Sequence, residues 1–374
     1  MSLLGQPPAR PGMTLAEVDT PALLLEFDAF ERNVRLLPAS FPSGRVRLRP
    51  HAKTHKCPEI ARRQLSAGAV GVCCQKVSEA EAMVNGGILN VHITNEIVGA
   101  CKLAALAELA RRARVSVCVD DAGNVSDLAA AARVAGCHLD VMVEINIGSG
   151  RCGVPPGAAA LELARQIVRS PHLRFAGLQA YYGSAQHMRG VGQRRAAAAT
   201  AAEQAFETKT LLLAHGIECP IITGGGTGTH IYDAASGVYD EIQAGSYVFM
   251  DADYARNEPS EGAPVFEQSL FVWTTLMSRP ADDRGTVDAG HKALSNDSGP
   301  PLIKGRPDIE YLRGADEHGV LRFHAPAQAP RVGDKLMLIP GHCDPTVNLH
   351  DWIVGVRGGR VEAVWPVTAR GAIR

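Results

Sequence analysis

A basic segment near the start of the chain carries the residue best suited to covalent catalysis. It reads RPHAKTHK over residues 49–56 and follows a short apolar run. If that run is a strand of a parallel barrel, Lys53 lies at the carboxyl ends of the strands, where such barrels place their active sites. Burial and the positive charges of Arg49 and Lys56 would lower the pKa of Lys53, as Schiff-base chemistry requires. A solvated basic strand end is the alternative interpretation.

Further along the chain, three segments that follow strand candidates could bind an anionic ligand. Glycines on both sides of Arg151, in the sequence GSGRCG, let the backbone approach a ligand that the guanidinium reaches. The run TGGGTGT at residues 223–229 lacks the Lys-Ser/Thr pair of a nucleotide-binding P-loop, and its successive amides suit a lone phosphate. The sequence QAGSY at residues 243–247 could complete that phosphate site. Plain loops and turns are the alternative for all three.

A last group of residues could bind a metal ion and move a proton. In an extended chain, the side chains of His342 and Asp344 point to one side and that of Cys343 to the other. An imidazole and a carboxylate form half of a site for Mn²⁺, Mg²⁺ or Zn²⁺, with water in the open positions. Tyr181 ends a strand candidate where its ring could line a cofactor pocket, and His187 on the next loop could act as a general base. Isolated residues of these types are more often packing or surface residues.

The elements that must position these residues alternate over the first two thirds of the chain. Short apolar runs without polar alternation are typical of strands buried on both faces, and Ala- and Leu-rich helical stripes separate them. About eight strand–helix repeats in about 230 residues predict a (β/α)8 barrel, and an open doubly wound sheet has the same periodicity. The strand candidates are residues 22–26, 46–49, 69–74, 90–94, 115–120, 139–145, 175–181, 219–223 and 241–244.

The hydrophobic pattern of the sequence changes after about residue 264. Helical stripes end, and short β-like runs separated by turn residues take their place, at residues 269–276, 285–288, 335–339, 353–356 and 360–364. We therefore expect an α/β protein with two domains. The first is a barrel over residues 21–260. The second is an all-β domain over residues 261–374, together with residues 1–20, and it carries His342 and Asp344.

The amino-acid composition limits the kinds of ligand that the protein could bind. The 374 residues include 38 Lys and Arg against 39 Asp and Glu, a formal net charge of −1. This balance offers no basic excess for nucleic acid or for an anionic membrane surface. The sequence shows no membrane span and no secretion signal, and its nine Cys lack a paired spacing, so we expect a cytoplasmic protein with reduced thiols. An enzyme acting on a small molecule fits these observations.

Taken together, the segments resemble the fold-type III pyridoxal-phosphate enzymes. More narrowly, they resemble the metal-activated family of D-threonine aldolases, D-serine dehydratases and 3-hydroxyaspartate aldolases and dehydratases. The matching segments are, in order, DTPALLL, RPHAKTHK, GVCCQKVSEAEA, ITNEIV, GSGRCGV, LQAYYGSAQHM, ITGGGTGT, IQAGSYVFMDADY, DEHGV and PGHCDPTVNLHDW. The resemblance implies an alanine racemase-like barrel, a C-terminal β domain, a homodimer with active sites at the subunit interface, and pyridoxal 5'-phosphate (PLP) with a divalent metal.

The resemblance also implies a role for each candidate residue. Lys53 matches the lysine that binds PLP covalently, Arg151 an arginine at its phenolic oxygen, and Tyr181 a tyrosine near its ring. Phosphate-binding positions match Gly225, Gly226, Thr227, Gly245 and Ser246. His187 matches a histidine beside the substrate hydroxyl, and the metal pair matches His342 and Asp344.

One departure from the dehydratase pattern concerns the metal. D-serine dehydratase relatives show His-x-Cys, whose thiolate favours zinc, whereas the second position here is Asp344. The resemblance therefore implies Mn²⁺ or Mg²⁺ before Zn²⁺, and the aldolase or hydroxyaspartate branches before D-serine dehydratase. The tail resembles 3-hydroxyaspartate aldolases most.

The expected reaction is cleavage of a D-β-hydroxy-α-amino acid, of the D-threonine or 3-hydroxyaspartate type, to glycine and an aldehyde. His187 would remove the β-hydroxyl proton, directly or through a metal-bound water. The alternative is a dehydratase of D-threo-3-hydroxyaspartate or D-serine that gives a keto acid and ammonia. A non-catalytic PLP carrier and an amino-acid racemase are more distant alternatives. The carrier would need no β domain, and the racemase would need a tyrosine base for which Tyr311 is the candidate.

Overall fold

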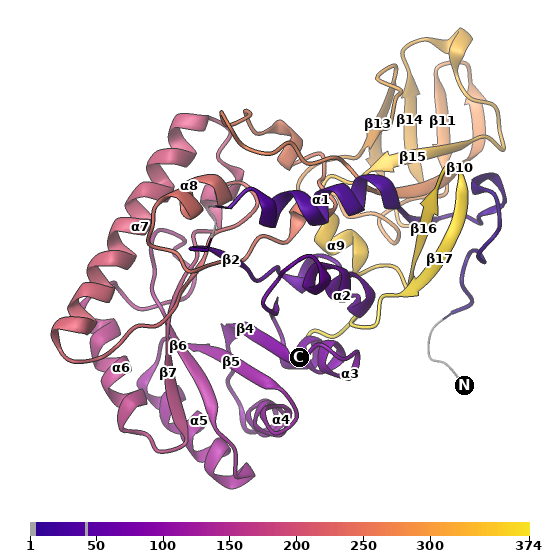
Figure 1. The fold of residues 1–374 in the computed structure, drawn as a ribbon. Coiled ribbons are helices and arrows are strands. Elements are labelled where there is room, and N and C mark those ends of the chain that lie inside the picture. Colours follow the sequence, from indigo (N-terminus) through magenta and orange to yellow (C-terminus); the bar gives the residue numbers. More distant parts are fainter. Residues whose placement is uncertain (1–4, 42–43) are drawn as a thin grey trace.

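An eight-stranded parallel sheet forms the core of the larger part of the protein (Figure 1). The computed structural model describes residues 5–41 and 44–374. Along the sheet the strands follow the order β2-β9-β8-β7-β6-β5-β4-β3. Their bounds are β2 Arg47–Leu48, β3 Val72–Cys74, β4 Asn90–Glu96, β5 Arg114–Val119, β6 Leu139–Glu144, β7 Leu173–Ala180, β8 Ile222–Gly224 and β9 Glu241–Ile242. Most of these residues are buried, as expected for strands covered on both faces.

The sheet closes on itself between its first and last strands. The backbone N–H of Val70 donates to the carbonyl oxygen of Leu48 at 2.9 Å, and that of Cys73 donates to the carbonyl oxygen of Pro50 at 2.8 Å. These bonds join the carboxyl end of β2 to β3. The sheet is therefore a barrel, as predicted, and not the open doubly wound alternative.

Helices alternate with the barrel strands and cover the outer face of the barrel. Their bounds are α2 Pro58–Ser66, α3 Val77–Asn85, α4 Ala100–Ala110, α5 Ala122–Ala135, α6 Ala158–Arg169, α7 Val191–Ala214 and α8 His230–Ala235, and α1 Phe27–Ala39 precedes them. Helix α5 has well-defined ends. The side chain of Asp121 accepts a hydrogen bond from the backbone N–H of Asn124, and Gly136 ends the helix with φ +65°. In the described part of the chain, no helix has both the length and the hydropathy to cross a membrane.

Nine strands form a second, mostly antiparallel sheet, which confirms the expected C-terminal β domain. The main path runs β13-β14-β11-β10-β1-β16-β17, and β15 pairs with β10 and β12. The bounds are β1 Ala22–Glu26, β10 Leu270–Ala281, β11 Arg284–Val287, β12 Leu302–Ile303, β13 Ile309–Gly314, β14 Gly319–Phe323, β15 Lys335–Ile339, β16 Trp352–Arg357 and β17 Arg360–Pro366.

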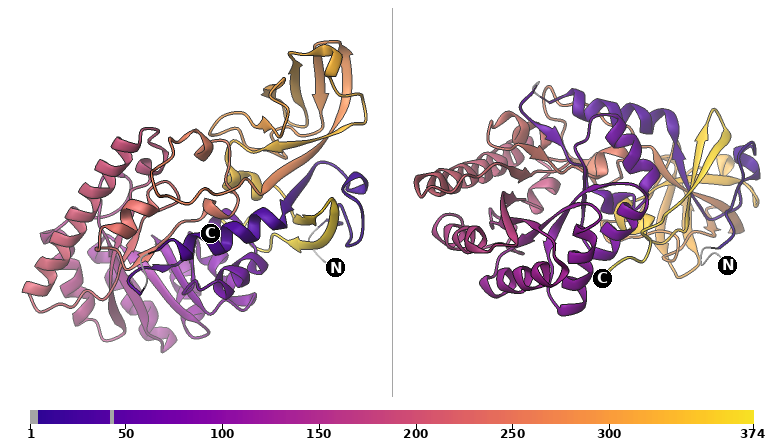
Figure 2. Two further views of the ribbon diagram at one scale, coloured as in Figure 1. Left: turned by 45° about the horizontal axis from the view of Figure 1, so that its top comes forward. Right: turned by 60° about the horizontal axis from the view of Figure 1, so that its bottom comes forward.

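Strand β1 corrects one expectation. Its residues, 22–26, were expected to be the first barrel strand, but β1 pairs with β10 on one side and with β16 on the other. Figure 2 shows this indigo segment beside the yellow C-terminal strands. A central strand buried on both faces has the same continuous apolar sequence in either sheet, so ALLLE alone does not identify its neighbours.

Three strands of the second sheet were not expected from the sequence. Strand β12 has only two residues, which is too short for a periodic signal. Strands β13 and β14 alternate buried and exposed side chains and carry charges, so a search for apolar runs passes over them.

Backbone hydrogen bonds join the end of the barrel domain to the second sheet. The N–H of Ala252 donates to the carbonyl oxygen of Pro340 at 2.9 Å, and that of Asp253 donates to Gly341 at 3.2 Å. In return, the N–H of Cys343 donates to the carboxylate of Asp251 at 3.1 Å. These contacts hold the segment with His342 and Asp344 against the barrel mouth.

Candidate active site

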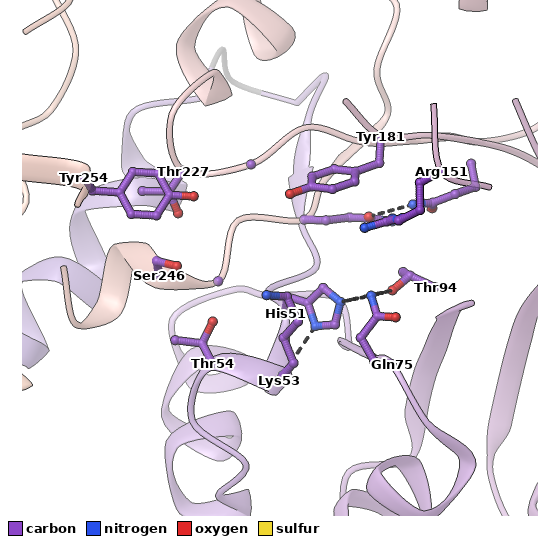
Figure 3. Close-up of a pocket in the computed structure, with 14 residues that line it drawn as sticks. His51, Lys53, Thr54, Gln75, Thr94, Arg151, Tyr181, Thr227, Ser246 and Tyr254 are labelled. Carbon is purple, nitrogen blue, oxygen red and sulfur yellow. Dashed lines mark hydrogen bonds between the residues drawn. The ribbon is translucent and has the colours of Figure 1, made fainter. Parts of the chain in front are cut away.

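A cavity opens at the carboxyl ends of the barrel strands (Figure 3). Its empty space is about 560 Å³ when the open mouth is included. Most of the predicted cofactor-binding residues line this one cavity, namely Lys53, Arg151, Tyr181, Gly226, Thr227, Gly245 and Ser246, and Gly225 adjoins it in the chain. The remaining lining residues are His51, Thr54, Gln75, Thr94, Gln179, Gln243 and Tyr254. None of these was assigned a role from the sequence, although several lie in the segments quoted above.

Lys53 lies on a 3₁₀ turn, Ala52–Thr54, directly after β2. Its Nζ contacts Oδ2 of Asp344, which belongs to the second sheet's domain. Burial alone would lower the pKa of Lys53, but the Asp344 carboxylate and Tyr181 outweigh burial, and the net pKa is raised. The same contact and the charge of His342 hold the pKa of Asp344 well below its usual range, although burial acts in the opposite direction.

The expected fall in the pKa of Lys53 is therefore wrong for the protein as described here. The expected causes were burial, which does act in that direction, and the charges of Arg49 and Lys56, but each of these two side chains is paired with a buried carboxylate. Arg49 Nε lies 2.7 Å from Glu241, and Lys56 Nζ lies 2.9 Å from Glu79. Their charges are compensated, and Asp344 is the charged group with the largest effect on Lys53.

The glycine-rich segments form a cup with free backbone donors. The N–H groups of Thr227, Gly245 and Ser246 make no hydrogen bond within the described residues. The two segments are joined by a bond from the N–H of Tyr247 to Oγ1 of Thr227 at 3.1 Å. A Cβ on Gly226 would lie 2.6 Å from the side-chain oxygen of Gln186, so a larger residue there would have to displace the Gln186 amide. Free amides in a closely packed loop fit a phosphate group.

Arg151 and Tyr181 lie together on the opposite side of the cavity (Figure 3). The guanidinium carbon of Arg151 is 5.7 Å from the centroid of the Tyr181 ring. At the end of β6, Glu144 is buried next to Glu96, and burial together with that neighbouring carboxylate raises the pKa of Glu144 to about 8. Arg151 thus projects from a region rich in carboxyl groups toward the cavity.

Uncharged polar side chains line the remaining wall. His51 Nε2 lies 3.0 Å from Thr94 Oγ1 and 3.1 Å from Gln75 Nε2 (Figure 3). Gln179 and Gln243 are hydrogen-bonded to each other at 3.0 and 2.8 Å. Uncharged polar residues of this kind carry no charge, glycine or spacing signal, so the sequence did not predict them as site residues. A polar residue that interrupts an otherwise apolar buried strand, as Gln179 does in β7, is the signal that could have found some of them.

The predicted metal pair flanks the start of a short helix, α9 Cys343–Val347. His342 is extended, but the chain turns into α9 at once, so the expected alternation of an extended segment is wrong. Among the residues that the structure describes, buried Oδ1 of Asp344 has no hydrogen-bond partner, and the imidazole of His342 is bonded only through Nδ1, to Asp297 at 2.7 Å. This leaves an imidazole nitrogen and a carboxylate oxygen available, and the residues fit a divalent cation that keeps water at its other positions.

A second group of potential ligands lies beside Arg151. Donor atoms of Glu96, Asp120 and Cys152 are within 4.8 Å of one another. The carboxylate of Asp120 accepts a hydrogen bond from the N–H of Gly153 at 2.9 Å. The group does not include the predicted metal residues.

His187 lies at the rim of the site, on the 3₁₀ turn Ser184–His187. Its side chain is 44% exposed, and its Nδ1 is 2.5 Å from Oδ2 of Asp253. The imidazole packs on Tyr254, with ring centroids 5.1 Å apart, and Tyr254 lines the cavity. The structure therefore brings the predicted cofactor, metal and base residues to one end of the barrel.

Comparison with known proteins identifies relatives over the whole chain. The model of the alanine racemase N-terminal domain matches residues 25–253, and a serine dehydratase domain model matches residues 269–356. D-threonine aldolase of an Arthrobacter species is 53% identical over 98% of this chain and 97% of its own. 3-hydroxy-D-aspartate aldolase of Paracoccus denitrificans (strain Pd 1222) is 47% identical over 97% of this chain and 95% of its own.

Solved structures agree with these sequence relatives. The crystal structure of D-threonine aldolase from Filomicrobium marinum matches with a TM-score of 0.97 and 52% identity, covering 99% of this chain and 100% of that one. D-threo-3-hydroxyaspartate dehydratase from Delftia sp. HT23 matches with a TM-score of 0.84 and 26% identity, over 94% and 98% of the two chains. The resemblance in the motifs is thereby confirmed. The chain belongs to the family of fold-type III PLP enzymes that pairs an alanine racemase-type barrel with a dehydratase-type β domain and includes the D-threonine and 3-hydroxy-D-aspartate aldolases.

Proposed function

We propose that this protein is a PLP- and divalent-metal-dependent aldolase, a carbon–carbon lyase that cleaves D-β-hydroxy-α-amino acids to glycine and an aldehyde. The observation that carries the proposal is the contact between Lys53 Nζ and Asp344 Oδ2. This contact supports the proposal because it brings the amine that would hold the cofactor next to a carboxylate that would hold the metal. A substrate whose amine takes the place of Lys53 on the cofactor would then have its β-hydroxyl near that carboxylate. The aldolase relatives, at 53% and 47% identity, support this reaction.

Different cavity residues would hold different parts of PLP. When bound, PLP would draw electrons from the bonds to Cα of the substrate. The N–H groups of Thr227, Gly245 and Ser246 would hold the phosphate, and Gly225 and Gly226 let the loop pack closely against Asp233 and Gln186. Arg151 and Tyr181 would border the ring, and Lys53 would provide the amine that holds the cofactor covalently.

His342 and Asp344 would hold the divalent ion, which when bound would lower the pKa of a coordinated hydroxyl. His187 would accept the proton of the β-hydroxyl at Nε2, because its Nδ1 is engaged by Asp253. As that proton leaves, the Cα–Cβ bond breaks and the β-carbon becomes the carbonyl carbon of the aldehyde. A carboxylate where dehydratase relatives have a thiolate moves the preference of the site toward harder ions, so we propose Mn²⁺ or Mg²⁺ before Zn²⁺.

A dehydratase is the second candidate function. It is favoured by the fold match to D-threo-3-hydroxyaspartate dehydratase from Delftia, at a TM-score of 0.84. That sequence relationship is distant, because the curated dehydratase relative is 29% identical, whereas the aldolases reach 53%. We also propose a homodimer with its active sites at the subunit interface and a cytoplasmic location, both supported only by the family resemblance and the composition.

Product analysis separates the two reactions. The enzyme loaded with PLP and Mn²⁺ is incubated with D-threonine and, separately, with D-threo-3-hydroxyaspartate, and glycine and ammonia are quantified. We expect glycine and aldehyde in equal amounts, with ammonia at the level of the enzyme-free control. Ammonia and a keto acid as main products would contradict the aldolase proposal in favour of the dehydratase, and the absence of any turnover would contradict both.

A substitution in the glycine-rich cup tests the proposed phosphate site. A Cβ on Gly245 would lie 2.4 Å from Oγ1 of Thr54 and 3.1 Å from the backbone oxygen of His51. We expect Gly245→Ala to weaken PLP binding about tenfold or more, which is about 1.4 kcal/mol, as measured by fluorescence titration of the apoenzyme. Gly192→Ala on helix α7, where a Cβ meets nothing within 4 Å, is the matched control. Equal PLP affinity in the two variants would argue against the site.

A further inference from the structure

The buried carboxylate of Asp253 contacts Nδ1 of the His187 imidazole. Oδ2 of Asp253 lies 2.5 Å from Nδ1 of His187, and the Asp253 side chain is only 7% exposed. Tyr254 packs against one face of the imidazole. Because the two ring nitrogens point in different directions, the contact with Asp253 leaves Nε2 free, and no hydrogen bond to Nε2 occurs within the described residues.

Two arginines fix the orientation of Asp253. Arg189 and Arg256 approach the same oxygen, Oδ1, at 2.5 and 2.7 Å. Arg189 also donates to the backbone oxygen of Asp253 at 2.7 Å. One carboxylate oxygen is thus occupied by both guanidinium groups, and the other is left for His187. Burial would raise the pKa of Asp253, but its bonds to Arg189 and His187 lower it, so the carboxylate stays charged.

Arg256 also connects this group to the domain that carries the metal pair. Its Nη2 donates to the backbone oxygen of Ser298 at 2.6 Å, and the preceding residue, Asp297, accepts from Nδ1 of His342 at 2.7 Å. The two histidines thus have similar surroundings. In each, Nδ1 faces a carboxylate and Nε2 is available, and one arginine bridges the segments that hold those carboxylates.

We propose that Asp253 is a positioning residue that fixes the tautomer and direction of His187. By accepting a hydrogen bond from Nδ1–H, it keeps the lone pair on Nε2, the nitrogen that faces away from it. This inference rests on the proposed function, in which His187 accepts the β-hydroxyl proton. The carboxylate would also stabilise the imidazolium formed by that proton transfer.

Asp253→Asn tests this role directly, because Arg189 and Arg256 determine the orientation of the new side-chain amide. Both occupy Oδ1 and can only donate, so the amide oxygen must face them and the NH₂ group must face His187. That NH₂ donates to Nδ1 and moves the imidazole proton to Nε2, which removes the basic lone pair. We expect kcat to fall about 100-fold, within the usual contribution of a general base, with KM changed less than about threefold.

The tautomer is measured directly, without relying on turnover. In ¹⁵N-histidine-labelled holoenzyme, the His187 signals, assigned by their loss in His187→Gln, are expected to show the proton on Nδ1 in the wild type and on Nε2 in Asp253→Asn. Asp253→Glu, which restores a carboxylate, is expected to recover the wild-type tautomer and part of kcat. Asp308→Asn, which alters an Asp–Arg pair remote from the cavity, is the matched control and should leave both unchanged.

Two results would overturn the inference. One is a wild-type tautomer in Asp253→Asn, whatever its kcat, because the loss would then reflect structure alone. The other is a reversed tautomer with unchanged kcat, because His187 would then not depend on Asp253 for catalysis. If the wild type forms no glycine but the tautomer still reverses in Asp253→Asn, the proposed function is contradicted and the orienting contact is supported. Thermal unfolding of each variant shows whether it is folded, and Asp253→Glu keeps the test decisive if Asp253→Asn is not.

Discussion

Lys53→Ala is expected to abolish covalent attachment of PLP and to lower turnover by at least about 1000-fold. Among the described residues that line the cavity, Lys53 alone carries an amine, so its loss leaves no such nucleophile for the cofactor aldehyde. The phosphate cup is untouched, because Thr227, Gly245 and Ser246 offer backbone groups. The variant should therefore still bind PLP, but non-covalently.

Three measurements check this expectation. The wild-type holoenzyme should show a visible absorption band of lysine-bound PLP, and borohydride reduction should fix the cofactor to the peptide that contains Lys53, as read by mass spectrometry. Lys53→Ala should lose the band and the labelled peptide but retain its unfolding temperature. Lys292→Ala, which removes an exposed lysine of the β domain, is the control that should keep both. Labelling of a different lysine in the wild type would overturn the assignment.

The same lysine shows where sequence reasoning succeeds and where it ends. Lys53, Arg151, Tyr181, Thr227 and Ser246 are far apart in the chain but line one cavity. They could be predicted to meet because each follows a buried strand, and parallel strands of a barrel end on the same side. The pKa of Lys53 could not be predicted in this way. It depends on Asp344, 291 residues away, and on the pairing of its basic neighbours with other carboxylates.

The fold, too, was predictable only in part from the sequence. Runs buried on both faces identified the barrel strands, whereas strand β1 has the same kind of sequence and lies in the other sheet. Its partners β10 and β16 are more than 240 residues distant, and no local pattern specifies such a pairing. Asp253 and Arg256 were not predicted for a similar reason, since an acid and a base in a polar segment have many possible partners.

Removal of either proposed metal ligand is the second large expected effect. His342→Ala and Asp344→Ala should each lower the affinity for Mn²⁺ by at least about 100-fold and turnover by at least about 1000-fold. Each substitution removes one of the two proposed protein ligands, and a single remaining ligand would not hold the ion. Mn²⁺ binding is measured by electron paramagnetic resonance of the free ion in holoenzyme titrations. Chelation of the wild type should abolish turnover while the visible band of bound PLP remains.

The two variants together separate metal binding from the contact with the lysine. Asp344 contacts Lys53 Nζ, whereas His342 is bonded to Asp297 and makes no hydrogen bond to Lys53 in the described structure. A loss caused only by a displaced lysine would therefore appear in Asp344→Ala and spare His342→Ala. If the two residues hold a metal together, both variants should lose Mn²⁺ affinity and turnover to the same extent. The visible band of bound PLP should remain in His342→Ala. Asp316→Asn on the surface of the β domain controls for the removal of a charge. Full turnover of the wild type after exhaustive chelation, or undiminished Mn²⁺ binding in both variants, would refute the site, because no route would then connect these two residues to the reaction through a cation.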